Sequence, residues 1–330
     1  MPELNESQIR SFQQSRGLNV TGVIDAVTSR ALEEARWKLG DRSLNLQDPP
    51  LMRGDDVAAL QSRLTEMGFD CGRVDGIYGY RSEAAVKEFQ RSVGIAVDGK
   101  CGPATIIGLL RLTRIVSGGA PTVMRESATQ RNRGPALANK VIVLNPDSDD
   151  ALIYDVALRT EGRLLALGAS VFLTRGISNS PSETERIAFT NQSGADLMIS
   201  LHLDSYKNEV AHGAATYFYG SDAHGVHSIV GERFASLVQR EICARTDLVN
   251  CRTHAMAWDL LRLTRAPAVQ IDLGYSSNPG DVERISRPDF RDVIAESLVI
   301  AIQRLYLAAE DDAKTGTLRI SDLRKAGIRI

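Results

Sequence analysis

The sequence lacks the features that mark several large classes of protein. Its formal net charge is −2, so it has no general basic field that would attract nucleic acid or an anionic membrane surface. No apolar run approaches the roughly 18 residues that a membrane-spanning helix needs. The opening residues MPELNESQIR are polar and acidic, without the basic segment and apolar stretch of a signal peptide. We therefore expect a cytoplasmic protein that does not bind nucleic acid.

Cysteine is also scarce, and the four cysteines present form no C-x-x-C pair. This spacing does not support a structural zinc cluster or a redox motif. Cys243 and Cys251 are close enough in sequence to pair, but a reducing compartment favours buried free thiols.

A chain of 330 residues is long enough for two or three domains, and its first third contains an internal repeat. Residues 12–32 align without gaps on residues 89–109, at a constant offset of 77 (89 − 12 = 77). The matched pairs are Phe12 and Phe89, Gln13 and Gln90, Gly17 and Gly94, Leu18 and Ile95, Val20 and Val97, Gly22 and Gly99, Thr28 and Thr105, and Leu32 and Leu109. A constant period of this kind indicates duplicated supersecondary units.

The second copy, residues 49–112, predicts three short amphipathic helices. Asp55 can cap a first helix that ends at Gly68. Ser82 can cap a second helix that ends at Gly94, and Pro103 stands at the start of a third. Such helices cannot bury their apolar faces singly, so we expect a small three-helix bundle.

The first copy, residues 1–48, is incomplete, because residues 4–35 match only the second half of the other copy. Two explanations are open at this point. Either the domain is truncated by the choice of start site, or it leans on its neighbour to cover its exposed face.

The composition changes after the second copy. Residues 113–139 carry glycine, proline, serine and several arginines without periodicity, which indicates a linker. Expected strands then cover 141–144, 171–174, 197–201, 215–219 and 269–273, and expected helices cover 152–167, 183–192, 226–246 and 289–307. This alternation predicts an α/β domain over residues 140–307, with a mainly parallel sheet flanked by helices. Residues 308–330 are polar and predict a mobile tail.

Three motifs in the second copy resemble the peptidoglycan-binding domain family. They are V-D-G-I-Y-G at 74–79, A-V-x-x-F-Q at 85–90 and G-x-x-V-D-G at 94–99, and the match covers residues 53–112. The resemblance implies that these bundles bind glycan or stem peptide. Phe12 and Phe89 are interpreted as core residues, because periodic apolar positions usually indicate packing.

Several blocks of the α/β region resemble the zinc-dependent N-acetylmuramoyl-L-alanine amidases. They are G-A-x-V-x-L-T-R at 168–175, A-D-L-M-I-S-L-H at 195–202, L-R-x-T at 261–264, P-A-V at 267–269 and G-Y-x-S-N-P at 274–279. Independent blocks in the same order make chance agreement improbable. The resemblance implies an amide hydrolase whose zinc is held by His, Glu and His, while a separate Glu transfers the proton.

Carried over position by position, the resemblance implies a dismantled reaction centre. The third ligand is retained as His202, but Ser148 stands at the position of the first, and Asp272 replaces the proton-transferring Glu. No Glu stands at the second ligand position, where Asp149 and Asp150 offer the nearest carboxylates. We therefore expect no cofactor, and zinc only if His202 acts together with one of these two aspartates.

The tail contains Thr315 and Thr317 in a stretch that is first acidic and then basic. The whole arrangement resembles an actinobacterial group of cytosolic amidase homologues. This resemblance implies that a serine/threonine kinase modifies the tail, with Thr315 at the matching position, and that a phosphothreonine-reading domain recognises it. It also implies control of the enolpyruvyl transferase that starts peptidoglycan precursor synthesis.

Three functions stay open on the sequence. The leading hypothesis is a non-catalytic cytoplasmic regulator of peptidoglycan precursor synthesis. The second is a zinc-dependent amidase with an atypical site. The third is a binding module for muropeptide or for a lipid-linked precursor at the inner face of the membrane.

Overall fold

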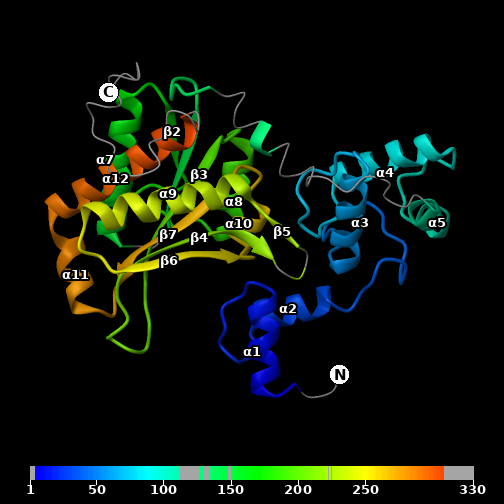
Figure 1. Ribbon diagram of the computed structural model, residues 1–330, viewed down its shortest axis with the longest axis horizontal. Coiled ribbons are helices and arrows are strands. Elements are labelled where there is room, and N and C mark those ends of the chain that lie inside the picture. Colours follow the sequence, from blue (N-terminus) through cyan, green and yellow to red (C-terminus); the bar gives the residue numbers. More distant parts are fainter. Residues whose placement is uncertain are drawn as a thin grey trace. The chain divides into compact units, whose positions relative to one another are not determined.

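The computed structural model describes residues 4–111, 126–128, 134–147, 150–221, 223 and 225–307. The chain forms two compact units, the first made mainly of residues 1–126 and the second mainly of residues 127–330. The first unit is helical and the second combines helices with a sheet (Figure 1). In the part of the chain that is described, no helix has the length and apolar character needed to cross a bilayer.

The first unit contains both copies of the repeat. Its helices are α1 (Glu6–Ser15), α2 (Ala26–Glu34), α3 (Asp55–Glu66), α4 (Tyr80–Val93) and α5 (Pro103–Arg111). The complete three-helix copy and the incomplete two-helix copy are therefore both confirmed. Two predicted caps are wrong, because Gly54 precedes α3 and Gly79 precedes α4 as N-cap residues.

A buried glutamine holds the turn that follows α4. Gln90 Nε2 donates to the Asp98 carboxylate at 2.8 Å and to the Lys100 carbonyl at 3.0 Å. It also donates to the Thr105 hydroxyl at 3.0 Å, and Gln90 Oε1 accepts from the Gly99 N–H at 2.9 Å. Because both polar atoms of the amide have partners, Gln90 can lie inside an apolar bundle without a large desolvation cost.

Gln13 forms the same bonds 77 residues earlier. Its Nε2 donates to the Thr21 hydroxyl at 2.9 Å, the Val23 carbonyl at 2.9 Å and the Thr28 hydroxyl at 3.0 Å. Its Oε1 accepts from the Gly22 N–H at 2.8 Å. These four hydrogen bonds of Gln90 are thus repeated by Gln13 at the offset found in the sequence.

A third glutamine, Gln61 in α3, holds the turn before α4. Gln61 Nε2 donates to Asp75 Oδ1 at 2.9 Å and to the Ile77 carbonyl at 3.0 Å, and Oε1 accepts from the Gly76 N–H at 2.8 Å. The Ser82 hydroxyl also accepts from Gln61 Nε2, at 3.1 Å. This bond explains why Ser82 lies inside α4 instead of capping it.

The apolar core of the first unit lies mainly in the second copy, with Leu44 contributed by the segment before it. It is formed by Leu44, Val57, Leu60, Leu64, Cys71, Tyr78, Ala85, Val86, Phe89, Cys101 and Leu109. Phe89 is fully buried, which confirms it as a core residue, whereas Phe12 is half-buried under the Arg16 guanidinium. Arg16 pairs with both carboxylate oxygens of Asp55 at 2.6 Å, so an ion pair connects the first copy to α3.

The second unit is built on a sheet with seven strands among the described residues. The strands are β1 (Val141–Pro146), β2 (Ser170–Leu173), β3 (Leu197–Asp204), β4 (Ala214–Ser221), β5 (Val226–His227), β6 (Asn250–Met256) and β7 (Ala268–Tyr275). The order is β2-β1-β3-β7-β4-β5, with β6 paired to β4. Strands β2, β1, β3 and β7 run parallel and β4 runs antiparallel to β7, which confirms the mainly parallel sheet.

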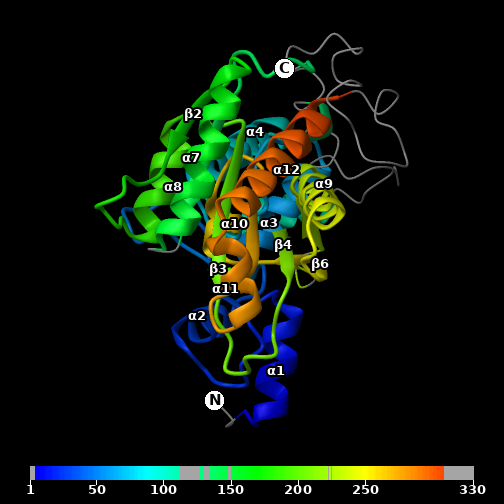
Figure 2. The same cartoon turned by 90° about the vertical axis from the view of Figure 1, so that its left-hand side faces the viewer.

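Helices cover this sheet on both faces. They are α7 (Ala151–Ala166), α8 (Glu183–Gln192), α9 (Ile229–Arg245), α10 (Asp259–Leu263), α11 (Pro279–Ser286) and α12 (Pro288–Tyr306). On one face α12 lies between α7 and α9, and together they enclose the apolar core (Figure 2). On the other face α10 packs against α8 and β7.

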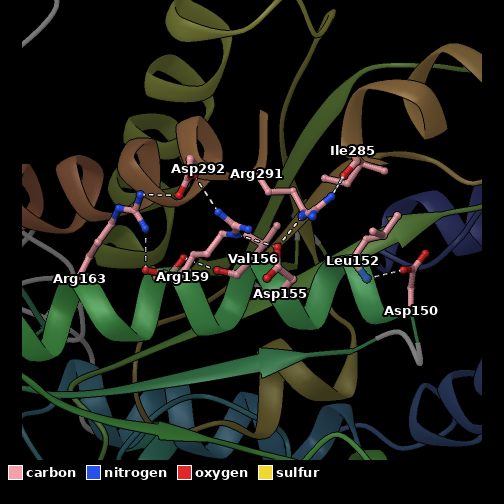
Figure 3. A network of polar contacts seen from close by, with 10 residues as sticks. Asp150, Leu152, Asp155, Val156, Arg159, Arg163, Ile285, Arg291 and Asp292 are labelled. Carbon is pink, nitrogen blue, oxygen red and sulfur yellow. Dashed lines mark hydrogen bonds and ion pairs between the residues drawn. The ribbon is translucent and has the colours of Figure 1, made fainter. Parts of the chain in front are cut away.

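An ionic network joins α7 to α12 across the surface of the helical layer (Figure 3). Asp155 accepts from Arg159 at 2.6 Å and from Arg291 at 2.5 Å. Asp292 pairs with Arg159 at 2.8 Å and with Arg163 at 2.7 Å. Arg159, Arg163 and Asp292 are partly exposed, so their ion pairs contribute little to stability, whereas Arg291 is buried against Asp155.

Candidate functional site

The two amidase positions predicted to survive, His202 and Asp272, lie side by side. They are direct partners in the register of β3 and β7, near the carboxyl ends of both strands. Leu201 points into the apolar core, so Ser200 and His202 face the opposite side of the sheet. In open α/β sheets, ligands bind outside the carboxyl ends of the strands, and this edge is therefore the candidate site.

A polar row supports the site two residues further into the sheet, on the same face. Asn145 lies beside Ser200, which lies beside Gln270 in the register of β1, β3 and β7. Asn145 Nδ2 donates to the Ser200 hydroxyl at 2.9 Å, and the Thr174 hydroxyl donates to Asn145 Oδ1 at 2.6 Å. These buried bonds fix the strand ends that carry the site.

His202 and Asp272 form a hydrogen-bonded pair. Nδ1 of the imidazole lies 3.0 Å from Asp272 Oδ1, which also accepts from Gln270 Nε2 at 3.1 Å. Burial of His202 opposes its protonation, but the Asp272 carboxylate, with Asp147 and Asp204 nearby, raises the pKa of the imidazole above its ordinary value. The folded protein therefore favours the protonated form of His202.

This pair predicts a pH-dependent stability. Below the unfolded-state pKa of about 6.5 the imidazolium is present in both states and the pair stabilises the fold fully. The stabilisation is lost as pH rises through the higher pKa of folded His202. Urea unfolding at about pH 5.5 and about pH 8.5 should show this loss.

Two variants separate this effect from other titrating groups. His202→Gln should flatten that part of the profile, whereas His212→Gln, at an exposed loop histidine, should not. An unchanged profile in His202→Gln would contradict the assignment.

A salt bridge occupies the end of β1 beside the pair. Asp147 is tied to β3 by its N–H, which donates to the Leu201 carbonyl at 2.9 Å. Its carboxylate accepts from Arg186 of α8, and the same guanidinium reaches Asn145 Oδ1 at 3.4 Å. Arg186 was not predicted as a site residue, because an arginine within a helix carries no local signal of its eventual partners.

Asp204 lies at the same edge of the sheet, as the last residue of β3. Its Oδ1 accepts from the Ser205 N–H at 2.7 Å. Burial raises the pKa of Asp204, and the neighbouring Asp272 carboxylate adds to the effect. Burial, followed by the charge of Asp204, also raises the pKa of Tyr275 to about 12. The site is therefore acidic apart from His202 and Arg186.

Asp281 of α11 holds the loops beside the site through hydrogen bonds. Its Oδ2 accepts from the Gly213 N–H at 2.9 Å and from the Tyr275 N–H at 3.1 Å. Gly274 has φ +127°, and a Cβ there would lie 3.0 Å from the Asp281 side chain. A glycine is required at 274 for both reasons.

Three aromatic rings, one from β4, one from β6 and one from the residue before α10, lie next to the pair. The Tyr217 ring centroid is 4.7 Å from that of Trp258 and 5.6 Å from that of His254. Burial raises the pKa of Tyr217, and the Asp272 carboxylate raises it further. The phenol of Tyr217 therefore stays protonated, and it lines the site with a polar but uncharged group.

The remaining predicted residues do not join the site in the described structure. Four of them lie outside the described residues: Ser148, Asp149, Thr315 and Thr317. Asp150 is described, and its carboxylate caps α7 by accepting from the Leu152 N–H at 2.7 Å. Its role as a metal ligand stays a prediction, and the carboxylate is already engaged at the helix terminus.

The described side chains do not fit a catalytic zinc. Such a site uses three protein ligands and leaves a fourth position for water. Among the described residues, no group of three or more His, Cys, Asp or Glu side chains is placed to hold a metal ion.

The cysteines offer no alternative reactive group. None of the four forms a disulfide. Burial raises the pKa of Cys101 to about 12, and burial likewise raises the pKa of Cys243 and of Cys251. Thiolate is the nucleophilic form, so these thiols are poorly reactive at neutral pH.

Two protein-family models match this chain, one over the amidase-like domain and one over the two repeats. The N-acetylmuramoyl-L-alanine amidase model matches residues 144–304, and the peptidoglycan binding domain model matches residues 4–32 and 53–107. The chain belongs to the N-acetylmuramoyl-L-alanine amidase family and carries peptidoglycan-binding-like repeats before its amidase-like domain.

One relative matches almost the whole chain. It is N-acetylmuramoyl-L-alanine amidase CwlM of Mycobacterium tuberculosis, 42% identical over 335 residues, which cover 96% of this chain and 82% of the relative. The germination-specific N-acetylmuramoyl-L-alanine amidase of Bacillus subtilis is 28% identical and covers 53% of this chain and 83% of its own length. Among solved structures, the amidase Ami1 of Mycobacterium smegmatis matches 52% of this chain and 98% of its own, with 19% identity and a TM-score of 0.46.

Proposed function

We propose that this chain is a non-catalytic member of the amidase family that regulates peptidoglycan precursor synthesis in the cytoplasm. The observation that carries the proposal is the pair of His202 and Asp272, whose Nδ1 and Oδ1 atoms lie 3.0 Å apart. Among the described residues, no group of three or more His, Cys, Asp or Glu side chains is placed to hold a metal ion around this pair. The pair therefore supports a site that keeps the amidase fold without its metal chemistry.

The side chain at position 272 gives further support. In the family resemblance this position carries the proton-transferring Glu, and aspartate is shorter by one methylene. A misplacement of about 1 Å at a reacting group can cost roughly a hundredfold in rate. Asp272 also accepts from both His202 and Gln270, so its Oδ1 is engaged inside the protein.

A zinc-dependent amidase is the second candidate, because one feature of the pair favours it. In metal sites, a ligand histidine commonly donates its other ring N–H to a carboxylate. The contact between His202 and Asp272 has this form. The relative from Mycobacterium tuberculosis is also named an amidase. In this candidate, Asp149 or Asp150 completes the ligand set with His202.

Metal content and hydrolysis separate the two candidates. Elemental analysis of the purified chain should find well under about 0.1 zinc per molecule, far below the one that a three-ligand site holds. Muropeptide digests should show no amide cleavage above the buffer control. His202→Ala and Asp272→Ala should leave both results unchanged. Stoichiometric zinc, or cleavage that Asp272→Ala abolishes, would establish the amidase instead.

A binding module is the third candidate, and the match of residues 53–107 to the peptidoglycan binding domain favours it. Its ligand would be a muropeptide or a lipid-linked precursor at the inner face of the membrane. Titration of the full chain with a soluble muropeptide tests this candidate. Saturable binding without any effect on precursor synthesis would favour it over the regulator.

The proposed regulation acts through the C-terminal tail, which lies outside the described residues. A serine/threonine kinase is the proposed modifying enzyme, and the enolpyruvyl transferase and a phosphothreonine-reading domain are the proposed partners. Phosphate adds nearly two negative charges, which an Arg-lined partner surface can recognise. Thr315 is the proposed acceptor, and Thr317 is the alternative acceptor in the same stretch.

Thr315→Ala should remove most of the kinase-dependent phosphate from the full chain. The fold should be unaffected, as judged by circular dichroism and thermal unfolding. Thr317→Ala, two residues away, is the matched control and should keep most of the phosphate. Equal phosphate incorporation in Thr315→Ala and the unmodified chain would contradict the assignment.

A further inference from the structure

A pocket of about 540 Å³ lies in the first unit, between the segment 35–39 and one face of α3. Pockets of this size hold small ligands. The one lining residue from elsewhere, Ala223, belongs to the same compact unit. The segment contributes Ala35, Trp37, Lys38 and Leu39, and the helix contributes Asp55, Ala58, Ala59, Ser62, Arg63 and Glu66.

The segment 35–39 belongs to neither repeat as the family defines it. The peptidoglycan binding domain model matches residues 4–32 and 53–107, so only the α3 side of the pocket falls within the matched ranges. The pocket is therefore a feature of how this chain connects its two copies. Its ligand class has to be inferred from its own side chains.

Trp37 is held in position by a series of contacts that begins at a buried carboxylate. Asp56 is 1% exposed and accepts from Arg42 Nε at 2.7 Å. The Arg42 guanidinium also donates to the Arg53 carbonyl at 2.6 Å, and it lies 4.8 Å from the centroid of the Trp37 ring. Within the described first unit, the residues packed on the apolar core include Leu39 but not Trp37. The indole is thus a positioned, half-buried ring that the core does not use.

The α3 side of the pocket is made of small residues. Ala58, Ala59 and Ser62 leave room beside the indole for a flat ligand. An indole presents a broad apolar surface, which suits the C–H face of a pyranose ring. A stem peptide of small and charged residues has no comparable flat face. The shape of the pocket therefore favours a sugar.

The charged groups of the pocket add a second requirement. Arg63 and Asp55 are already engaged, the first with a carbonyl of α5 and the second with an arginine of α1. Lys38 and Glu66 are exposed. An ammonium group donates to carboxylates, and a carboxylate accepts from hydroxyl and amide groups. The pocket therefore suits a sugar that carries a carboxylate as well as hydroxyl groups.

We propose that this pocket binds the glycan of peptidoglycan. One pyranose ring stacks on Trp37, and Lys38 binds the lactyl carboxylate of N-acetylmuramic acid. The ligand class is thus an N-acetylated saccharide that carries a carboxylate. This proposal rests on the binding function considered above as the third candidate, and it selects the glycan over the stem peptide as the part that is recognised.

The pocket can be observed separately, because the chain has two tryptophans. Trp258→Phe leaves Trp37 as the sole tryptophan, and Trp37→Phe leaves Trp258, beside the pair of His202 and Asp272. The disaccharide of N-acetylglucosamine and N-acetylmuramic acid should change the emission of full-length Trp258→Phe saturably and leave that of Trp37→Phe unchanged. A response of Trp258 alone would place the sugar at the α/β domain and overturn the proposal.

Two variants test the pocket by calorimetry. Trp37→Ala should weaken binding of the disaccharide about fivefold, because the stacked ring is lost. Ala59→Arg should have at least this effect, since it fills the pocket from an exposed helical position without removing a large side chain. Ala84→Arg, at an exposed position of α4, is the matched control and should bind like the unmodified chain.

A third variant tests the carboxylate. Lys38→Met should weaken the disaccharide about threefold, as expected for an exposed ion pair. Binding of N,N′-diacetylchitobiose, which has no carboxylate, should not respond to this change. Disaccharide binding that neither Trp37→Ala nor Ala59→Arg weakens overturns the pocket but leaves the binding function standing. Binding of the free stem peptide without the disaccharide overturns the glycan assignment, and binding of neither ligand overturns both the pocket and the binding function.

Discussion

Gln90→Leu is expected to lower the free energy of unfolding of the second repeat by about 3 kcal/mol. Leucine has a similar volume and suits the apolar surroundings, so the loss comes from hydrogen bonds and not from packing. Removal of the amide leaves the Gly99 N–H without its side-chain acceptor, and the Thr105 hydroxyl keeps only its bond to the Lys100 carbonyl. It also releases the turn that bridges to Leu44, so the effect should spread to that segment.

The chain has two compact units, and a single unfolding transition is not assumed. Amide exchange at Gly99 and in the core around Phe89 reports on the second repeat directly. Gln13→Leu should cause the same local loss in the first repeat, and Gln14→Leu, at an exposed position of α1, is the matched control. Equal exchange in Gln90→Leu and Gln14→Leu would contradict the structural role of the buried amide.

The buried glutamines show which interactions could not be predicted from the sequence. The offset of 77 aligned Gln13 with Gln90, but nothing local indicates that their amides are buried. Gln90 meets groups 8 to 15 residues ahead, and these converge only when α4 and α5 pack. Gln61 fell outside the matched pairs, because more residues separate it from its turn. The sequence therefore predicted that Gln13 and Gln90 occupy equivalent positions, but it did not predict the hydrogen bonds that they share.

Strands and helices could be predicted from the sequence where their buried side chains are apolar. The expected strands at 141–144, 197–201 and 269–273 lie within β1, β3 and β7, which are buried over most of their length. The strand β6 was missed because its residues are exposed or half-exposed and form no buried apolar run. The predicted helix 226–246 begins too early, since residues 226–227 form β5 and Ser228 caps α9.

The candidate site was predictable in part, for a topological reason. His202 and Asp272 end neighbouring parallel strands, so their strand assignments already place them at one edge of the sheet. Arg186 and Asp281 come from helices, and their partners are 39 and 68 residues away in sequence. Contacts of this kind depend on how the helices dock, which no local pattern encodes.

Asp281→Ala is expected to destabilise the α/β domain by about 3 kcal/mol, because hydrogen bonds to a charged acceptor are the stronger class. Asp281 is 1% exposed, and its Oδ2 accepts from the Gly213 N–H and the Tyr275 N–H. Alanine leaves both donors without this partner. The loops after β3 and β7 should then move more freely, and the contact between His202 and Asp272 should weaken with them.

Two measurements and two further variants test this prediction. Urea unfolding gives the change in free energy, and the NMR titration of His202 shows whether its raised pKa falls toward the ordinary value. Asp281→Asn keeps a side-chain acceptor and should lose less than half as much stability. Asp289→Ala, at an exposed carboxylate on α12, is the matched surface control. If Asp281→Ala unfolds like Asp289→Ala and leaves the His202 titration unchanged, Asp281 does not hold the site together. If stability falls but the titration is unchanged, the loops are pinned by Asp281 while the pair is positioned by its strands alone.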